Sequence, residues 1–254
     1  MDRRQFIQAG SAASVLGVAA GCASTGGGSG AGGNVVVVGG GYGGATAAKY
    51  IRMWSEGRVN VTLVEPNDSF ISCPISNLVI GGSKQMADIT TPYDNLAKRH
   101  GVKIIKDRAV SIDAGKRTVT LAGGTVLPYD RLVLSPGIEF MWDALPGLKK
   151  PGAQDKVLHS WNAGPQTVAL RRQLEAMPDG GVYALTIPLS PYRCPPGPYE
   201  RACQVAHYFS KAKPKSKVLI LDANDDVTSK GPRFKKAWAD RYKGIIDYRP
   251  KHNL

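Results

Sequence analysis

The sequence predicts an α/β fold in which parallel strands alternate with helices. Three observations carry this prediction: an apolar strand that runs straight into a glycine-rich turn and a helix, a second strand that ends in an acidic residue, and a later segment that repeats the strand–helix–strand order. With 254 residues, 43% of them hydrophobic, the chain can form one large or two small domains. We place the boundaries at 1–33, 34–150 and 151–254.

Residues 1–33 are predicted to be an export signal and a linker. Arg3 and Arg4 precede a modest apolar run from Ala9 to Ala20, which resembles a twin-arginine signal for the export of folded proteins. The run is short for a transmembrane helix and rich in alanine and glycine. Ser24–Gly33 is a flexible linker. The mature chain is therefore expected to work in the periplasm.

Cys22 follows the apolar run in the sequence AAGC. It could be the lipid-bearing cysteine of a lipoprotein signal, although Ala19 stands where leucine is usual. Cleavage near Ala23 is the competing interpretation, and both remain open.

The first fold element is a strand, Asn34–Val38, whose four consecutive valines are typical of a parallel strand buried on both faces. The glycines that follow have the G-x-G-x-x-G spacing, and a helix is predicted over Ala45–Trp54. Gly39 makes the tight turn, Gly41 lets the backbone approach a pyrophosphate, and Gly44 lets the helix pack closely on the strand. The phosphates would bind the free N–H groups at the start of the helix.

Glu65 ends the second predicted strand, Val59–Val64, where a carboxylate can hydrogen-bond a ribose hydroxyl. Strand, glycines, helix, strand and acid together predict a dinucleotide site. The remaining elements of this domain are a helix between Thr91-Pro92 and Gly101, a strand over 102–105, a meander over 109–112, 117–121 and 125–127, and a strand over 131–134 that leads to Gly137. This order is typical of the FAD half of a flavoprotein reductase. Ala109 and Gly137 are included among the predicted cofactor contacts.

A second dinucleotide fold is predicted from helices over 165–177 and 199–211 and strands over 182–187 and 217–221, followed by a helix over 233–242. Its connecting loop has five prolines between 188 and 198 and one glycine. Because proline has no N–H to offer a phosphate, this loop cannot hold a pyrophosphate as the first one can. We infer that the fold was kept while NAD binding was lost.

Cys194 stands in that loop, next to Arg193 and just before a helix that carries Arg201 in its first turn. Positive neighbours and a helix N-terminus both stabilise a thiolate, so Cys194 is a candidate catalytic residue. Glu200 could transfer protons there, or act as a routine helix cap. Cys203 is expected to pack on the helix face, too far from Cys194 for an unstrained disulfide.

The chain has a formal net charge of +13, and twelve Lys and Arg stand against five Asp from Lys211 to Leu254. No nucleic-acid-binding motif and no interleaving of basic and aromatic residues accompanies this excess. The excess of basic residues predicts a basic face exposed to solvent. An acidic protein partner is the second interpretation.

Four segments resemble one known family: VVVVGGGYGGATAAKYI at 35–51, CPISN at 73–77, AGPQTVALRRQLE at 163–175 and RCPPGPYERA at 193–202. They are similar to the flavoprotein subunit of flavocytochrome c sulfide dehydrogenase, over nearly all of 34–240. The resemblance implies a glutathione-reductase-like fold with FAD in the first domain. It also implies oxidation of sulfide at a redox disulfide, with electrons passed through the flavin to a c-type cytochrome subunit.

The same resemblance implies roles for two cysteines. Cys73 falls where the family attaches the flavin covalently through its 8α-methyl group, and Cys194 at the first cysteine of the redox disulfide. From the residues alone, Cys73 could be paired, free or chemically used. Pro74 stands where some members have a tyrosine.

The family continues past residue 254, completes the second domain and brings a second disulfide cysteine, so the fold is predicted to be incomplete at its C-terminus. A truncated gene product, a fragment and a short functional relative all remain open. Because no cysteine follows Cys203, we expect a reactive Cys194 thiol but little sulfide-dependent cytochrome c reduction by this chain alone.

Three other functions compete with this one. An NAD(P)H-dependent disulfide reductase needs a second glycine-rich loop and usually a close cysteine pair, and both are missing from the sequence. A sulfide:quinone oxidoreductase predicts membrane-facing amphipathic helices. A catalytically silent FAD-binding subunit is the alternative that is not an enzyme.

Overall fold

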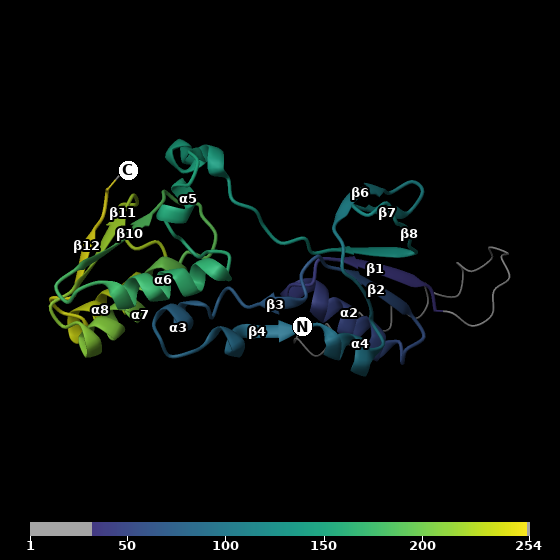
Figure 1. Cartoon of the computed structure of the whole chain (residues 1–254), viewed down its shortest axis with the longest axis horizontal. Helices are drawn as coiled ribbons and strands as arrows, with labels where there is room; N and C mark the ends of the chain where they lie inside the picture. The colour runs from purple at the N-terminus through teal and green to yellow at the C-terminus, as the bar shows by residue number, and fades with distance from the viewer. Residues whose placement is uncertain (1–31, 253–254) are drawn as a thin grey trace, which may run out of the picture.

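The computed structural model describes residues 32–252, so the predicted export signal and Cys22 lie outside the described residues. The chain forms two α/β lobes, each built on a parallel sheet (Figure 1). The α/β prediction is confirmed by these sheets and the helices that cover them. None of the described helices is long and apolar enough to cross a membrane.

The first lobe has a four-stranded parallel sheet in the order β5-β2-β1-β9. Its strands are β1 (Asn34–Val38), β2 (Asn60–Val64), β5 (Lys103–Ile105) and β9 (Arg131–Leu134). Helices α2 (Tyr42–Trp54) and α4 (Asp94–His100) lie on one face (Figure 1). An antiparallel meander follows β5, with strands β6 (Ala109–Asp113), β7 (Thr118–Leu121) and β8 (Val126–Pro128).

The valines of β1 explain why this strand is apolar throughout. Val35 and Val37 belong to the core cluster that includes Ala48 of α2. Val36 and Val38 belong to a second cluster, with Val119 and other residues of the meander. Because successive side chains of a strand point to opposite faces, β1 must be apolar at every position to fill both cores.

The second lobe has a three-stranded parallel sheet in the order β10-β11-β12. Its strands are β10 (Val182–Ile187), β11 (Lys217–Asp222) and β12 (Ile246–Arg249), and its helices are α6 (Pro165–Ala176), α7 (Gly197–Ala212) and α8 (Gly231–Arg241). Residues of α6, α7, α8, β10 and β11 form one core cluster, centred on the fully buried Tyr199 and Phe209. The predicted repeat of the strand–helix–strand order is confirmed.

Strands β3 (Ser69–Ile71) and β4 (Thr90–Pro92) and helix α3 (Asn77–Ile80), which were not predicted from the sequence, lie between the two sheets (Figure 1). Strand β4 includes the Thr91-Pro92 pair that was predicted to start a helix. Strands β3 and β4 pair antiparallel. Helix α3 packs on α6 and α7 of the second lobe. The other short elements are three 3₁₀ turns, η1 (Met86–Ile89), η2 (Trp142–Ala144) and η3 (Pro146–Lys149), and helix α5 (Ala153–Lys156).

Several predicted bounds differ from the structure by one to three residues, and one strand of the second sheet was not predicted. Helix α2 begins at Tyr42, three residues before the predicted start at Ala45, because Gly43 and Gly44 already belong to its first turn. Strand β12 was not predicted, because only alternate residues of its sequence IDYR are apolar and it lies at the edge of its sheet.

Candidate functional site

The glycine-rich loop joins β1 to α2 at the carboxyl edge of the first sheet. Gly39 has a φ of +93°, and a Cβ built on it would lie 2.0 Å from the carbonyl oxygen of Ser135, which follows β9. A Cβ on Gly44 would lie 1.8 Å from the carbonyl oxygen of Gly39. No other residue fits either position, so the turn and the close helix contact expected from these glycines are present.

Gly41 is different, because its Cβ position is open. It is the N-cap of α2, and the nearest atom to a Cβ built there belongs to Phe70, at 3.9 Å. No side chain caps the helix and no acidic residue lies in its first turn. The first N–H groups of α2 therefore face an open space in which the helix dipole favours an anion. These features fit the pyrophosphate of a dinucleotide.

Glu65 follows β2 at the same edge of the sheet and is only 7% exposed. Its Oε2 accepts a hydrogen bond from the backbone N–H of Gly40 at 2.7 Å. Its Oε1 accepts from the backbone and side-chain nitrogens of Asn67, at 2.9 and 2.6 Å. A carboxylate has about four acceptor positions, so one remains for a ribose hydroxyl. The contact between Glu65 and a ribose hydroxyl stays a prediction. The hydrogen bond from Gly40 to Glu65 was not predicted from the sequence.

Tyr93 also holds the glycine loop, and sequence reasoning missed it. Its hydroxyl donates to the carbonyl oxygen of Gly40 at 2.9 Å. Burial, and second the nearby carboxylate of Glu65, raise the pKa of Tyr93 far above its usual value, so it stays a neutral donor. Nothing in the local sequence singles out a tyrosine 53 residues from its partner.

The other two predicted cofactor contacts follow further strands of the first lobe. Gly137 lies beyond β9, is exposed with a φ of +86°, and has no atom within 4 Å of its Cβ position. Ala109 opens β6, is half-buried and packs on the core cluster shared with the meander. Their contact with a cofactor stays a prediction.

Cys73 and Cys194 are brought to the same residue, Trp161. The thiol of Cys73 donates to the main-chain oxygen of Trp161 at 3.1 Å. A Cβ built on Gly197 would lie 3.1 Å from the Cys194 sulfur and 3.4 Å from the Trp161 ring, so the sulfur and the ring are neighbours. Cys194 is exposed, has a φ of +57°, and lies just before α7. The structure thus gathers two cysteines that are far apart in the sequence.

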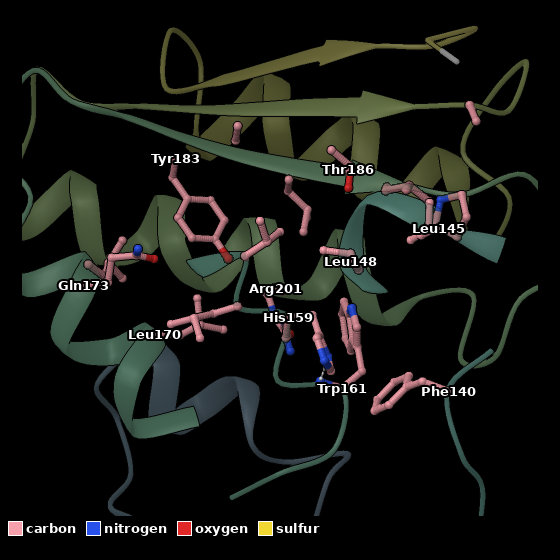
Figure 2. A pocket seen from close by; sticks show the side chains of 18 of the residues that line it. Phe140, Leu145, Leu148, His159, Trp161, Leu170, Gln173, Tyr183, Thr186 and Arg201 are labelled. Carbon is pink, nitrogen blue, oxygen red and sulfur yellow. Dashed lines mark hydrogen bonds between the residues drawn. The ribbon is translucent and has the colours of Figure 1, made fainter. Parts of the chain in front are cut away.

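Arg201 was expected to stabilise a thiolate at Cys194, but its side chain contacts other groups. It is 1% exposed, and its three nitrogens donate to the side-chain oxygen of Asn77 and to the carbonyl oxygens of His159 and Ser160. Its guanidinium also lies 3.6 Å from the centre of the Trp161 ring (Figure 2). Arg201 therefore clamps the Trp161 segment instead of hydrogen-bonding to Cys194.

The remaining predicted residues of α7 have separate surroundings. Cys203 accepts a hydrogen bond from the indole N–H of Trp238 at 3.3 Å and packs against the core of the second lobe, as expected. Burial raises the pKa of the Cys203 thiol. Glu200 lies in the first turn of α7 and is partly exposed. Its part in proton transfer stays a prediction.

Comparison with known proteins places these features in a family. Residues 33–176 match the pyridine nucleotide-disulphide oxidoreductase family, and residues 167–254 match the central region of the flavoprotein chain of sulfide dehydrogenase [flavocytochrome c]. The chain is also 58% identical over 38 residues to that flavoprotein chain from Chlorobaculum thiosulfatiphilum, a match that covers 15% of this chain and 77% of the known sequence. The chain belongs to this flavoprotein family.

Two longer relatives agree on the fold. The chain is 25% identical over 207 residues to the mitochondrial sulfide:quinone oxidoreductase of Dictyostelium discoideum, covering 81% of this chain and 43% of that enzyme. It superposes on the crystal structure of the sulfide:quinone oxidoreductase from Aquifex aeolicus with a TM-score of 0.68 and 22% identity, covering 86% of this chain and 51% of that one. The FAD/NAD(P)-binding oxidoreductase fold is thereby confirmed. The chain spans about half the length of these two relatives.

In the second lobe, Asp222 ends β11, much as Glu65 follows β2 in the first lobe. Asp222 is fully buried and accepts from the hydroxyls of Tyr199 and Tyr248, at 2.6 and 3.1 Å. It also accepts from the backbone and side-chain nitrogens of Asn224, at 2.9 and 2.7 Å. The protein's own donors fill about all of its acceptor positions. This arrangement, with the proline-rich loop, supports the inference that NAD binding was lost.

A cavity of 1090 Å³ lies along β10 in the second lobe (Figure 2). Aromatic and aliphatic side chains line most of it. His159 and Arg201 lie on its wall, and burial, with the charge of Arg201, lowers the pKa of His159. No cluster of three or more metal-ligating side chains occurs among residues 32–252.

Proposed function

We propose that this chain is an FAD-dependent oxidoreductase that oxidises sulfide and passes the electrons to a c-type cytochrome. The observation that carries the proposal is the convergence of Cys73 and Cys194 on Trp161, in a chain whose first lobe has an open glycine loop. Family membership supports it, because the Chlorobaculum relative is the flavoprotein chain of a sulfide dehydrogenase.

The first lobe would hold FAD through groups that are already in place. The N–H groups at the start of α2 bind the pyrophosphate, which approaches over Gly41, and the free acceptor position of Glu65 binds a ribose hydroxyl. Ala109 and Gly137 contact the cofactor from the ends of neighbouring elements. Cys73 forms a thioether to the flavin. When bound, FAD supplies two-electron redox chemistry between the sulfide and a one-electron acceptor.

The residues of the second lobe would handle the sulfide. Oxidation of HS⁻ to zero-valent sulfur releases two electrons and one proton, so two molecules of ferric cytochrome c are reduced for each sulfide. With FAD as the acceptor of the two electrons, the exposed Cys194 thiolate would take up the zero-valent sulfur as a persulfide, and Glu200 in the first turn of the following helix would accept the proton. The clamp made by Arg201 holds the ring of Trp161, whose main-chain oxygen accepts the hydrogen bond from Cys73.

Steady-state assays with two acceptors test this proposal. The purified chain, first alone and then with its cytochrome subunit, is given sulfide together with either cytochrome c or decylubiquinone. Alone, it is expected to reduce little cytochrome c. Reduction of cytochrome c that is lost in Cys194→Ser supports the proposal. Reduction of the quinone alone favours the activity named for the Dictyostelium and Aquifex relatives. If FAD is bound but neither acceptor is reduced, even with the cytochrome subunit present, the chain is a silent flavin-binding subunit.

We further propose that the chain works in the periplasm, exported by the signal at 1–33, with a lipid anchor at Cys22 as one possible end product of processing. Fractionation of the source cells tests both parts. Export predicts protein in the periplasmic or membrane fraction, and lipidation predicts an N-terminal peptide of increased mass that begins at Cys22. The basic surface suits an acidic face on the cytochrome partner.

A further inference from the structure

The C-terminal half of α2 carries an exposed stripe of aromatic and apolar side chains. Tyr50, Met53 and Trp54 are spaced i, i+3 and i+4, on the side of the helix opposite the buried Ala48. All three are exposed, and Trp54 is 78% exposed. The other three tryptophans of the chain are buried or half-buried. Because the outward positions of a surface helix are usually polar, this stripe indicates a binding surface.

The rings of Tyr50 and Trp54 form one patch at the end of the helix. Their centres lie 5.0 Å apart. The ammonium group of Lys49 lies 5.3 Å from the centre of the Tyr50 ring, within reach of a cation–π interaction. Aromatic surface and positive charge therefore share the same end of α2.

Further basic residues lie close to this patch. Arg52 donates to the carbonyl oxygen of His100 at 2.9 Å, so the C-terminal ends of α2 and α4 lie together. Within residues 42–58 and 94–103, the basic side chains are Lys49, Arg52, Arg58, Lys98, Arg99 and Lys103. The same two segments contain two carboxylates. This end of the first lobe is thus positively charged as well as aromatic.

We propose that the C-terminal end of α2 docks on the surface of a bilayer that contains anionic phospholipids. Tryptophan and tyrosine rings accompanied by Lys and Arg are typical of the membrane–water interface. A protein partner fits less well, because lysine is depleted from protein interfaces, whereas Lys49 lies over the Tyr50 ring within this patch. Anionic lipid headgroups supply the negative charge that the basic side chains complement.

The point where the N-terminal residues join the fold agrees with this orientation. The N–H of Gly32 donates to the carbonyl oxygen of Arg58 at 2.9 Å, four residues after the end of α2. Gly32 is ten residues after Cys22, a stretch that can span at most about 35 Å. A lipid at Cys22, as proposed above, would therefore hold this end of α2 near the bilayer. The aromatic and basic patch does not rest on that lipid.

Docking through this end leaves the cofactor site accessible. Helix α2 begins after Gly41 and ends at Trp54, and an α-helix rises about 1.5 Å per residue, so Trp54 lies about 20 Å from the glycine loop. The proposal requires neither flavin nor sulfide chemistry. Its failure and the failure of the proposed function are therefore separate results.

Co-sedimentation with vesicles tests the proposal on the full chain, with Cys22→Ser in every variant to exclude a lipid anchor. Vesicles of phosphatidylcholine with phosphatidylglycerol should bind the chain more strongly than vesicles of phosphatidylcholine alone. Trp54→Glu should weaken binding to the anionic vesicles about tenfold. Val126→Glu is the matched control, because Val126 is 53% exposed on the meander, on the other side of the same sheet (Figure 1). It adds the same charge, keeps the same N-terminal residues and should leave binding unchanged.

Tryptophan fluorescence locates the contact without a change of charge. Phospholipids brominated in their acyl chains should quench the fluorescence of Trp54. Trp54→Phe keeps an aromatic ring, so it should remove this quenching while binding stays within about twofold. Equal binding of Trp54→Glu and Val126→Glu, or quenching that persists in Trp54→Phe, would overturn the proposal. It would also be overturned if the chain ignored the vesicles while a photo-crosslinker at position 54 captured a protein in the source cells.

Discussion

The thiol of Cys73 donates a hydrogen bond to the main-chain oxygen of Trp161, 3.1 Å away and 88 residues later in the sequence. The bond joins the turn after β3 to the segment before α6. The Arg201 guanidinium lies 3.6 Å from the centre of the Trp161 ring, and the ring and the Cys194 sulfur both border the Cβ position of Gly197. Trp161 is thus the residue through which the predicted flavin cysteine and the predicted catalytic cysteine are connected.

Covalent attachment at Cys73 is the first testable consequence. If Cys73 carries the flavin, acid denaturation of the native protein should leave yellow colour on the polypeptide, and Cys73→Ser should release all of it. Cys203→Ser is the matched control, since that thiol is half-buried against Trp238 in the second lobe, away from the turn that carries Cys73. Flavin that is fully stripped from the wild-type protein by acid would refute the thioether.

Glu65 should stabilise the loop as well as bind the cofactor. In Glu65→Ala, the N–H groups of Gly40 and Asn67 lose a buried acceptor, which should lower the free energy of unfolding by about 1–3 kcal/mol and weaken FAD binding. Urea unfolding and a flavin titration measure the two effects. Asp68→Ala removes a carboxylate that is 79% exposed and should change neither. If Glu65→Ala had the same free energy of unfolding as the wild type, the buried hydrogen bonds to Glu65 would contribute nothing to stability.

Arg201 should be a structural clamp, whose loss disturbs both cysteines. Arg201→Met removes bonds to Asn77, His159 and Ser160, with an expected loss of about 2–4 kcal/mol of unfolding free energy. The exposed Arg193→Met should stay within about 0.5 kcal/mol of the wild type. Equal stability of the two variants would contradict the clamp.

Cys194 and Cys203 should differ in their reaction with iodoacetamide. Cys194 is exposed, whereas burial raises the pKa of Cys203 above the value of an unfolded thiol. A raised pKa means less thiolate at a given pH, so Cys203 should react appreciably only as the pH rises past about 9, the ordinary value for its thiol. Peptide mapping after labelling at pH 7 should find Cys194 modified first. Faster labelling of Cys203 would contradict the structure.

The sequence alone predicted the features that depend on residues close together in the chain, such as strand bounds and turn glycines. The bounds of β9 and β10 match the prediction, because apolar runs between turn residues define both strands. The tight positions of Gly39 and Gly44 followed from their spacing in the motif. What sequence reasoning missed depends on distant partners. The bond from Tyr93 to Gly40 and the burial of Arg201 are set by tertiary packing, and the short strands β3 and β4 form only as a pair.

The central claim is that the open glycine loop holds FAD, and flavin content tests it most directly. Absorbance of the protein purified without added flavin, compared with its protein content, should show bound FAD in the wild type. Gly41→Val places a branched side chain in the pyrophosphate path and should abolish that signal. Gly147→Val adds the same side chain where no atom lies within 4 Å and should keep it. Equal FAD content in the Gly41→Val variant and the wild type would contradict the account.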